Sequence, residues 1–415
     1  MFYGAYNGQG LFAANNQISI NASDFEYNLA TSGGGISSFY ENVLSLNDVT
    51  LFNNIASETG AAIDIDTSNT VSIISSTFDS NNVQNGDGGA VASKVQNIIA
   101  VNDSTFSNNS ARSGKGGALW LDSGSKITFL GSNDLLHNSA EVGGALFGTS
   151  IPLWAIDGDL NIEGNEAAFG SAIALAFFSE SGSVLTNITL TNNKASMAGT
   201  FFWLCSGPSC NEPTNQGLIF ANNSAPYGNN FATQPTSIQS ATEYNVTVYN
   251  RPLNPSISLY IYDFYGQLVI SDNETVVESS VFDYSCRSFV GTLASSTVEV
   301  SKEGLTTFND ITAFCNPEGN LTIHYTAKPS LSYFDIADPS DYYVINASIW
   351  SFRNCQNGEK YLNGACVTCG NGTYSLQYKE DGICIRCPVE GKGCYANNID
   401  LSQAIGGSMN FLTQS

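Results

Sequence analysis

The sequence of 415 residues has few charged residues and very few basic ones. Charged residues make up 12% of the chain, against about 25% in ordinary soluble domains. The 14 Lys and Arg are outnumbered by 37 Asp and Glu, which leaves a net charge of −23. Such an acidic chain repels phosphate backbones, so we expect no nucleic-acid partner. The best apolar run, Ala172–Phe178, is far shorter than the roughly 18 residues that a membrane span needs.

Basic partners for acid–base chemistry are also scarce, because the only histidines are His137 and His324. Glycoside cleavage needs two facing carboxylates, and sites of the pectinase type add a nearby His or Arg. The closest carboxylate candidates are Asp64, Asp66, Asp157 and Asp159. We interpret all four as outward residues of strands and turns. No Gly-rich phosphate loop is present either, since the Gly pairs recur at a fixed period and open no helix. The sequence predicts no enzymatic activity, no cofactor and no metal site.

Two short patterns repeat along the first 231 residues. One is a turn of small residues followed by an apolar residue, as in Gly116-Gly117-Ala118-Leu119. The other is an apolar residue with Asn three positions later, as in Phe106 and Asn109. The repeated asparagines are Asn28, Asn54, Asn81, Asn109, Asn138, Asn165, Asn193 and Asn223. Successive members lie 26 to 30 residues apart, so both patterns share one register.

Segments between these motifs alternate apolar and polar residues, as in Leu119–Asp122, and are rich in Val, Ile, Thr and Phe. This pattern is typical of strands rather than helices. Several short strands in each repeat predict an all-β fold, a parallel β-helix of eight or nine coils over residues 1–235, with coils stacked about 4.8 Å apart. The asparagines should then form an inward ladder, and the Gly sites should form tight bends. Asp66, Lys94 and Asp122 should form an exposed column of alternating charge.

These paired repeats resemble those of the chlamydial polymorphic outer-membrane proteins. Similar repeats occur in surface proteins of protists and algae. The resemblance covers residues 1 to about 235. It implies a right-handed parallel β-helix of the pectin-lyase-like kind, used in adhesion or as a surface scaffold.

After residue 235 the repeat disappears and alternating strands separated by turns take over. Residues 243–351 therefore predict a β-sandwich. Within it, Asp263–Gln267 resembles bacterial-type immunoglobulin-like modules. The two cysteines of this region, Cys286 and Cys315, are expected to form a disulfide. We assign residues 352–397 to a Cys-rich module and residues 398–415 to a tail.

The Cys-rich module holds Cys355, Cys366, Cys369, Cys384, Cys387 and Cys394. Its segment Cys369–Ser375 resembles the Cys repeats of ephrin receptors and tumour-necrosis-factor receptors. Four of these cysteines nearly have zinc-site spacing, but an even count in a short, core-poor module favours disulfides. Of the 15 possible connectivities we expect the sequential one. Cys205 and Cys210 should bridge locally, so all ten cysteines should be paired in an oxidising compartment.

Ten sequons for N-linked glycans are present, about as many as chance gives in so Asn-rich a chain. They are Asn21, Asn102, Asn108, Asn187, Asn222, Asn245, Asn273, Asn320, Asn346 and Asn371. The sequons become glycan sites if the cysteine argument for secretion holds. No signal peptide is visible at the start of the chain.

The sequence as a whole predicts an extracellular or cell-surface scaffold without enzymatic activity, a subunit of a coat, appendage or fibril. Two alternatives remain open: an adhesin that binds glycan or protein as a monomer, and a polysaccharide lyase or hydrolase. Self-association is the expected partnership, because Gly8–Leu11 already matches a coil and no amphipathic helix precedes it. If Met1 is the true start, that end should dock on a second copy or a partner. Otherwise upstream sequence is missing.

Overall fold

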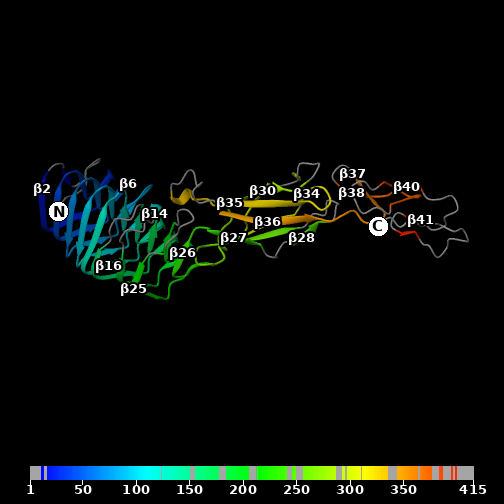
Figure 1. Ribbon diagram of the computed structural model, residues 1–415. Coiled ribbons are helices and arrows are strands. Elements are labelled where there is room, and N and C mark those ends of the chain that lie inside the picture. The colour runs from blue at the N-terminus through cyan, green and yellow to red at the C-terminus, as the bar shows by residue number, and fades with distance from the viewer. Residues whose placement is uncertain are drawn as a thin grey trace, which may run out of the picture.

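The computed structural model describes residues 11–399 except for 14–15, 123, 150–154, 177–183, 205–211, 213, 241–244, 249–255, 287–291, 295–296, 310, 335–343, 363–364, 376–382, 387–393 and 396–397. Figure 1 shows an elongated molecule, with a β-helix at the N-terminal end, a second β region in the middle and short strands at the far end. Within these ranges the only helical element is η1, a 3-10 turn at Ser332–Phe334. No helix there has the length and apolar character to cross a bilayer.

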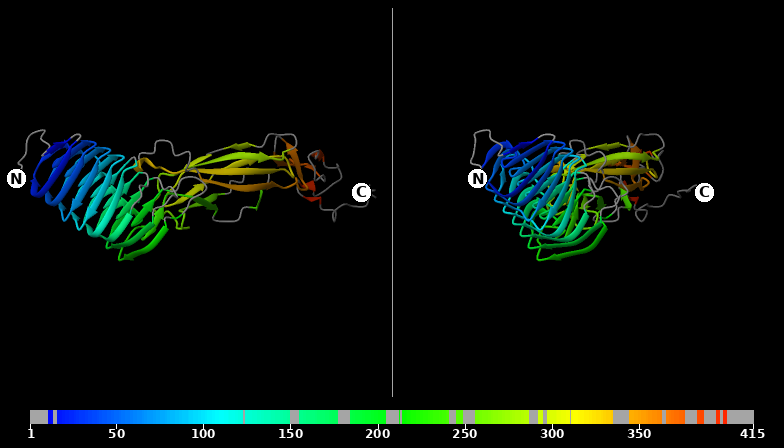
Figure 2. Two further views of the ribbon diagram at one scale, coloured as in Figure 1. Left: turned by 60° about the vertical axis from the view of Figure 1, so that its left-hand side comes forward. Right: turned by 90° about the vertical axis from the view of Figure 1, so that its left-hand side faces the viewer.

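Three parallel sheets build the β-helix (Figure 2). The nine-stranded sheet contains β1 (Leu11–Ala13), β4 (Ile36–Tyr40), β7 (Ile63–Thr67), β11 (Val91–Val95), β15 (Leu119–Leu121), β18 (Leu146–Gly148), β21 (Ile173–Leu175), β24 (Phe201–Trp203) and β26 (Phe231–Thr233). The seven-stranded sheet contains β3 (Leu29–Ser32), β6 (Ile55–Thr59), β10 (Asn82–Val83), β14 (Ser110–Lys115), β17 (Ser139–Val142), β20 (Glu166–Phe169) and β23 (Lys194–Ala198). The ten-stranded sheet contains β2 (Gln17–Glu26), β5 (Val43–Phe52), β8 (Thr70–Ile74), β9 (Thr77–Asp79), β12 (Ile98–Asn102), β13 (Thr105–Ser107), β16 (Lys126–Leu136), β19 (Ala155–Glu163), β22 (Val184–Thr191) and β25 (Thr214–Ala221). The nine-stranded sheet takes one strand from each coil, in agreement with the predicted eight or nine coils.

The interior of the β-helix is a continuous apolar column. Inward residues repeat from coil to coil, so that Ile63 pairs with Val91 and Val91 with Leu119, all buried. Aromatic rings stack in the same way, with the centroids of Phe78 and Phe106 4.4 Å apart. Stacking similar side chains on one another lets each strand form its backbone hydrogen bonds while the core stays closely packed. This explains the fixed repeat.

The predicted asparagine ladder is confirmed. The backbone N and the Nδ2 of Asn81 donate to Asn109 Oδ1 at 3.0 and 2.9 Å, and Asn109 donates in the same way to Asn138. The pattern runs from Asn28 to Asn223, and every member before Asn223 is at most 2% exposed. The residue before each ladder member has a positive φ; these residues are Tyr27, Asn53, Ser80, Asn108, His137, Gly164, Asn192 and Asn222. The ladder thus holds a left-handed turn in place in every coil.

The Gly turns have two separate steric reasons. Gly116 has a φ of +68°, a region that residues with a Cβ rarely adopt. Gly117 has ordinary dihedrals, but a Cβ there would lie 2.1 Å from the carbonyl oxygen of Gly144 in the next coil. Each turn therefore brings the backbones of two coils into direct contact, as predicted for these sites.

The second region has two main sheets. The smaller one contains β27 (Ser237–Ser240), β29 (Ile257–Tyr262) and β33 (Leu305–Phe308). The larger one contains, in spatial order, β28 (Asn245–Val248), β36 (Val344–Phe352), β35 (Asn320–Lys328), β30 (Val276–Tyr284) and β32 (Val298–Val300). A separate pair joins β31 (Thr292–Ala294) to β34 (Thr312–Phe314). Apolar residues of both main sheets share one core, and β27 adds a strand upstream of residue 243, where we placed the start of this region.

A loop of this second region closes the last coil of the β-helix. The Trp203 indole N–H donates to Tyr265 Oη at 3.2 Å, and Gln267 Nε2 donates to the carbonyl oxygen of Phe231 at 2.9 Å. The ring of Phe264 lies against Trp203, with centroids 5.3 Å apart. The segment Asp263–Gln267, which resembles immunoglobulin-like modules in sequence, therefore covers the apolar end that a β-helix would otherwise expose.

The Cys-rich region consists of short antiparallel pairs. They are β37 (Glu359–Leu362) with β38 (Ala365–Thr368), β39 (Thr373–Tyr374) with β40 (Ile385–Arg386), and β41 (Cys394–Tyr395) with β42 (Asn398–Ile399). Because these strands are so short, they bury little apolar surface. The stability of this region therefore depends on its disulfides.

Candidate functional site

The most distinctive surface of the β-helix is the corner where each coil passes from the seven-stranded to the nine-stranded sheet. The turn at Gly60–Ala62 brings Thr59 next to Asp64, and Thr59 Oγ1 donates to Asp64 Oδ1 at 2.8 Å. Strand stacking repeats these two positions in the other coils and produces two facing columns. We call these two columns the corner surface.

The columns change chemistry along the axis. On the nine-stranded sheet the paired residues are Ser37, Asp64, Ala92, Trp120, Phe147, Ala174, Phe202 and Ala232. On the seven-stranded sheet they are Ser32, Thr59 and Asp87, followed by Lys115, Val142, Phe169, Ala198 and Tyr227. The half nearer the N-terminus is polar, and the half nearer the second region is apolar. The boundary lies at Lys115, whose Nζ stands 5.6 Å from the centroid of the Phe147 ring.

The apolar half is covered by a segment of the second region. The loop after β35 places Phe334 against Phe202 and Phe169, with ring centroids 5.3 and 6.0 Å apart, and Tyr333 against Phe169 at 5.2 Å. Leu331 and Phe334 are buried there. We call residues 331–334 the strap. A cavity of about 150 Å³ remains beside it, lined by Phe169, Phe202 and the strap, among others. The strap fixes the second region to the side of the β-helix.

The polar half is organised around the Asp64 carboxylate. Lys94 Nζ lies 3.0 Å from Asp64 Oδ2, and Thr59 Oγ1 lies 2.9 Å from Ser32 Oγ. Asp64 faces away from the β-helix interior, as predicted, but it is only 4% exposed because the corner encloses it. Further along, Trp120 Nε1 is buried with no acceptor among the described residues.

The predicted column of Asp66, Lys94 and Asp122 is aligned by strand register, but its members are half-buried rather than exposed, and Lys94 pairs outside the column. Strand register places Lys94 level with Asp66, since Ser93 pairs with Ile65 and Val95 with Thr67. The ammonium nevertheless bonds to Asp64, because a buried carboxylate needs a counter-charge more than the half-buried carboxylate of Asp66 does. Asp122 instead accepts a hydrogen bond from Thr149 Oγ1.

The four carboxylates considered for catalysis are not brought together. Asp64 and Asp66 lie on β7 of the nine-stranded sheet, while Asp157 and Asp159 lie exposed on β19 of the ten-stranded sheet. His137 occupies a left-handed turn position of the asparagine ladder, and His324 lies in the second region, stacked on Phe282. The corner therefore offers hydroxyl, carboxylate and ammonium groups in a row, an arrangement suited to binding.

Burial raises the pKa of the Asp64 carboxyl above its ordinary 3.8, and the Lys94 ammonium opposes that rise. A raised pKa in the folded state means that protonation of Asp64 adds stability. This contribution is fully present below pH 3.8 and is lost as the pH rises through the raised pKa.

We expect Asp64→Asn to remove this dependence of stability on pH. As the pH falls from about 7 to 4, the free energy of unfolding of the wild type should rise relative to that of the variant. Urea unfolding across this range, with exposed Asp157→Asn as the control, measures it. Parallel curves for Asp64→Asn and wild type would contradict the assignment.

The structure pairs six of the ten cysteines. The disulfides are Cys286–Cys315, Cys355–Cys366 and Cys369–Cys384, with no free cysteine among the described residues. The last two are the sequential pairs expected, and they leave no tetrathiolate zinc site at these positions. Cys205, Cys210 and Cys387 lie outside the described residues, as does the side chain of Cys394.

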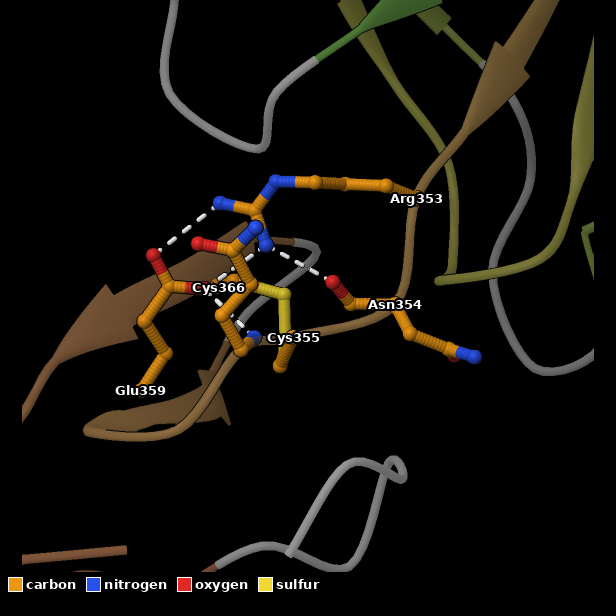
Figure 3. The surroundings of a disulfide bond; sticks show 6 residues. Arg353, Asn354, Cys355, Glu359 and Cys366 are labelled. Atoms are coloured by element: carbon orange, nitrogen blue, oxygen red, sulfur yellow. Dashed lines mark hydrogen bonds and ion pairs between the residues drawn. A yellow bond between two sulfur atoms is a disulfide. The ribbon is translucent and has the colours of Figure 1, made fainter.

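An ion pair lies beside the Cys355–Cys366 disulfide, at the end of the second region (Figure 3). Arg353 follows β36, and its Nη1 and Nη2 bind the two Glu359 carboxylate oxygens at 2.8 and 3.0 Å. Glu359 Oε2 also accepts the backbone N–H of Gln356 at 2.8 Å. This half-buried, bidentate pair orients the Cys-rich region at its first turn.

Most sequons stand where a glycan has room. Seven are exposed: Asn21, Asn108, Asn187, Asn222, Asn273, Asn320 and Asn371. Asn102 is half-buried, and the side chain of Asn245 lies outside the described residues. Asn346 is half-buried, and its Nδ2 donates to the carbonyl oxygen of Ile238. A glycan on Asn346 would have to displace that contact, so this site fits the prediction least.

One coil of the β-helix is matched by a known family. Residues 103–122 match the Chlamydia polymorphic membrane protein (Chlamydia_PMP) repeat. This stretch contains Asn109 of the ladder and the turn at Gly116 and Gly117. No curated protein and no solved structure matches the chain. The similarity to this repeat therefore rests on the same two motifs that build the stacked coils.

Proposed function

We propose that the chain is an extracellular structural and adhesive protein of a cell surface, without enzymatic activity, whose β-helix and second region act as one stiff rod. The observation that carries this proposal is the continuous core between them. Residues of the corner surface, such as Phe147 and Phe202, belong to the same apolar cluster as Tyr325 and Trp350 of the second region. Shared cores resist bending, whereas a flexible linker would not.

The chemistry of the chain supports a place outside the cell. Disulfides persist in oxidising compartments, and the described cysteines are paired. Exposed sequons lie on the β-helix and on the second region, for example Asn108 and Asn273. The match to a repeat of polymorphic membrane proteins is compatible with a cell surface.

The polar half of the corner surface is the proposed adhesive face. Half-buried Thr59 and Lys94 offer donors and acceptors on successive coils, spaced about 4.8 Å apart along the axis, and the half-buried ring of Trp120 continues the row on the next coil. Hydroxyl groups of a sugar chain can exchange hydrogen bonds with such a row. A linear array suits an extended polymer better than a compact ligand, so we assign neutral cell-wall polysaccharides as the ligand class.

Affinity electrophoresis of the full chain through gels containing xylan or β-glucan tests this proposal. We expect retardation of the wild type and its loss in the double variant Lys94→Ala/Trp120→Phe, because the variant removes the Lys94 ammonium donor and reduces the aromatic surface at position 120. Lys126→Ala, an exposed lysine on the ten-stranded sheet, is the matched control and should be retarded like the wild type. No new reducing ends should appear on incubation with pectin or alginate.

Two results would contradict the proposal. Equal mobility of wild type and double variant in every gel would remove the adhesive face from the corner surface. Release of reducing ends that Asp64→Asn abolishes would replace adhesion by hydrolysis or lysis.

A further inference from the structure

The outer face of the five-stranded sheet carries apolar side chains toward solvent. On β35, Leu321, Ile323 and Tyr325 point into the core, so Thr322, His324 and Thr326 form the outer face. Strand register extends this outer face to Ile345 and Ile349 on β36 and to Val298 and Val300 on β32. An antiparallel sheet with one solvated face normally alternates apolar inside and polar outside. This sheet departs from that pattern.

The exposure of these residues is large. Ile345 is 61% exposed, Ile349 53%, Val298 48% and Val300 55%. Phe282 is 69% exposed and lies flat on His324, with centroids 3.9 Å apart and planes 9° apart. Exposed apolar residues on three strands of one sheet face, β30, β32 and β36, mark an interaction site rather than ordinary surface variation.

The outer face holds two carboxylates on β30, Glu278 and the exposed Asp283, and Lys328 neutralises the first of them, although the chain as a whole carries −23. Lys328 Nζ lies 2.6 Å from Glu278 Oε1, and both belong to the outer face through the pairing of β35 and β30. Repulsion between two copies of an acidic chain is weakest where charges are already paired. The face can therefore approach its own copy more easily than a surface of unpaired carboxylates can.

The face is also large enough for a weak specific contact. β30, β35 and β36 have nine residues each. Nine residues extend about 30 Å, and neighbouring strands stand about 4.8 Å apart, so these strands and β32 present roughly 500 Å². Two such faces together bury about 1,000 Å², the lower limit for a specific interface.

We propose that this outer face packs against the same face of a second copy across a two-fold axis. Two faces of β-branched residues interdigitate as the sheets of a β-sandwich do, and a two-fold contact needs only one self-complementary surface. This inference goes beyond the adhesive role and stands without it, because it uses no residue of the corner surface.

Sedimentation velocity of the full chain over about 1–100 µM tests the proposal, since an interface of this size is weak. We expect a monomer–dimer equilibrium, and in the double variant Ile345→Lys/Ile349→Lys an association at least about tenfold weaker. The added lysines lower the net negative charge, so general repulsion cannot explain the loss. The matched control is Ile98→Lys/Ile219→Lys, which changes isoleucines of similar exposure, 54% and 58%, on the β-helix and should dimerise like the wild type.

Cross-linking locates the contact independently. Ala347 is exposed and pairs with His324 at the centre of the face, so Ala347→Cys should form a covalent dimer on mild oxidation. Ser332→Cys, an exposed position in the strap, should not. A wild type that stays monomeric over the whole range, or a double variant that dimerises equally well, would overturn the proposal. A monomer that floats with phosphatidylcholine vesicles would also overturn it, because a lipid surface would then occupy the face.

Discussion

Asn109→Ala is expected to destabilise the β-helix by about 3 kcal/mol, because several buried groups lose partners at roughly 1–3 kcal/mol each. Asn109 Oδ1 accepts from the backbone N and the Nδ2 of Asn81, and its own Nδ2 donates to the carbonyl oxygen of Phe78 at 2.9 Å. Asn109 is fully buried, so water cannot replace these bonds without opening the coil. Urea unfolding followed by circular dichroism measures the loss.

Asn47→Ala is the matched control for that experiment. Asn47→Ala removes the same side-chain atoms as Asn109→Ala, but Asn47 is exposed, on β5 of the ten-stranded sheet. We expect it to stay within about 0.5 kcal/mol of the wild type. If the two variants unfold at the same urea concentration, the ladder contributes no more than a surface asparagine, and the structural reason for the repeat fails.

The ladder could be predicted because one residue type recurs at one spacing. Two further polar columns obey the same spacing and were missed. In the first, Asn42 donates its backbone N–H to Asn69 Oδ1, and Asn69 donates to Asn97. Its next member is Ser125, whose Oγ accepts the backbone N–H of Asn97 at 3.3 Å. The column is hidden in the sequence because a hydroxyl and an amide oxygen serve equally as acceptors.

The second missed column mixes residue types from the start. Val49 donates its backbone N–H to Ser76 Oγ, Ser76 donates to Ser104 Oγ, and Ser104 donates to Asn133 Oδ1. A search for any short polar acceptor at the coil spacing, instead of Asn alone, would have found both columns. Each column supports a turn of the coil, so the β-helix has three polar columns with one function.

The corner surface could be predicted only in part. The repeat aligns Asp64 with Ala92 and Trp120, so the column itself follows from the sequence. The strap does not follow from it, because Phe334 meets Phe202 across more than 100 residues of sequence. An irregular loop has no periodicity that would indicate where it packs. The pairing of Lys94 with Asp64 does not follow from the sequence either, since register gives the level of a residue but not the direction of a long side chain.

Phe334→Ala is expected to loosen the joint between the β-helix and the second region. The ring of Phe334 contacts Phe147, Phe169 and Phe202, with centroids 6.3, 6.0 and 5.3 Å away, so its removal leaves a cavity over three coils. Removing a buried Phe side chain costs about 3–5 kcal/mol. We expect this loss to fall on the docking of the strap rather than on the coils, because the ladder and the inner core of the β-helix are untouched.

Small-angle X-ray scattering of the monomer at low concentration distinguishes a loosened joint from a rigid one. The wild type should scatter as one elongated body, while Phe334→Ala should show a broader distribution of interatomic distances with unchanged β-sheet circular dichroism. Phe39→Ala, which removes the same ring from a position 38% exposed on the β-helix, should scatter like the wild type. The loop at Asp263–Gln267 still covers the last coil in the variant, so the two parts stay attached through Trp203 and Phe231. An unchanged distance distribution for Phe334→Ala would mean that this end cap alone holds the rod straight, and the strap would then contribute stability without stiffness.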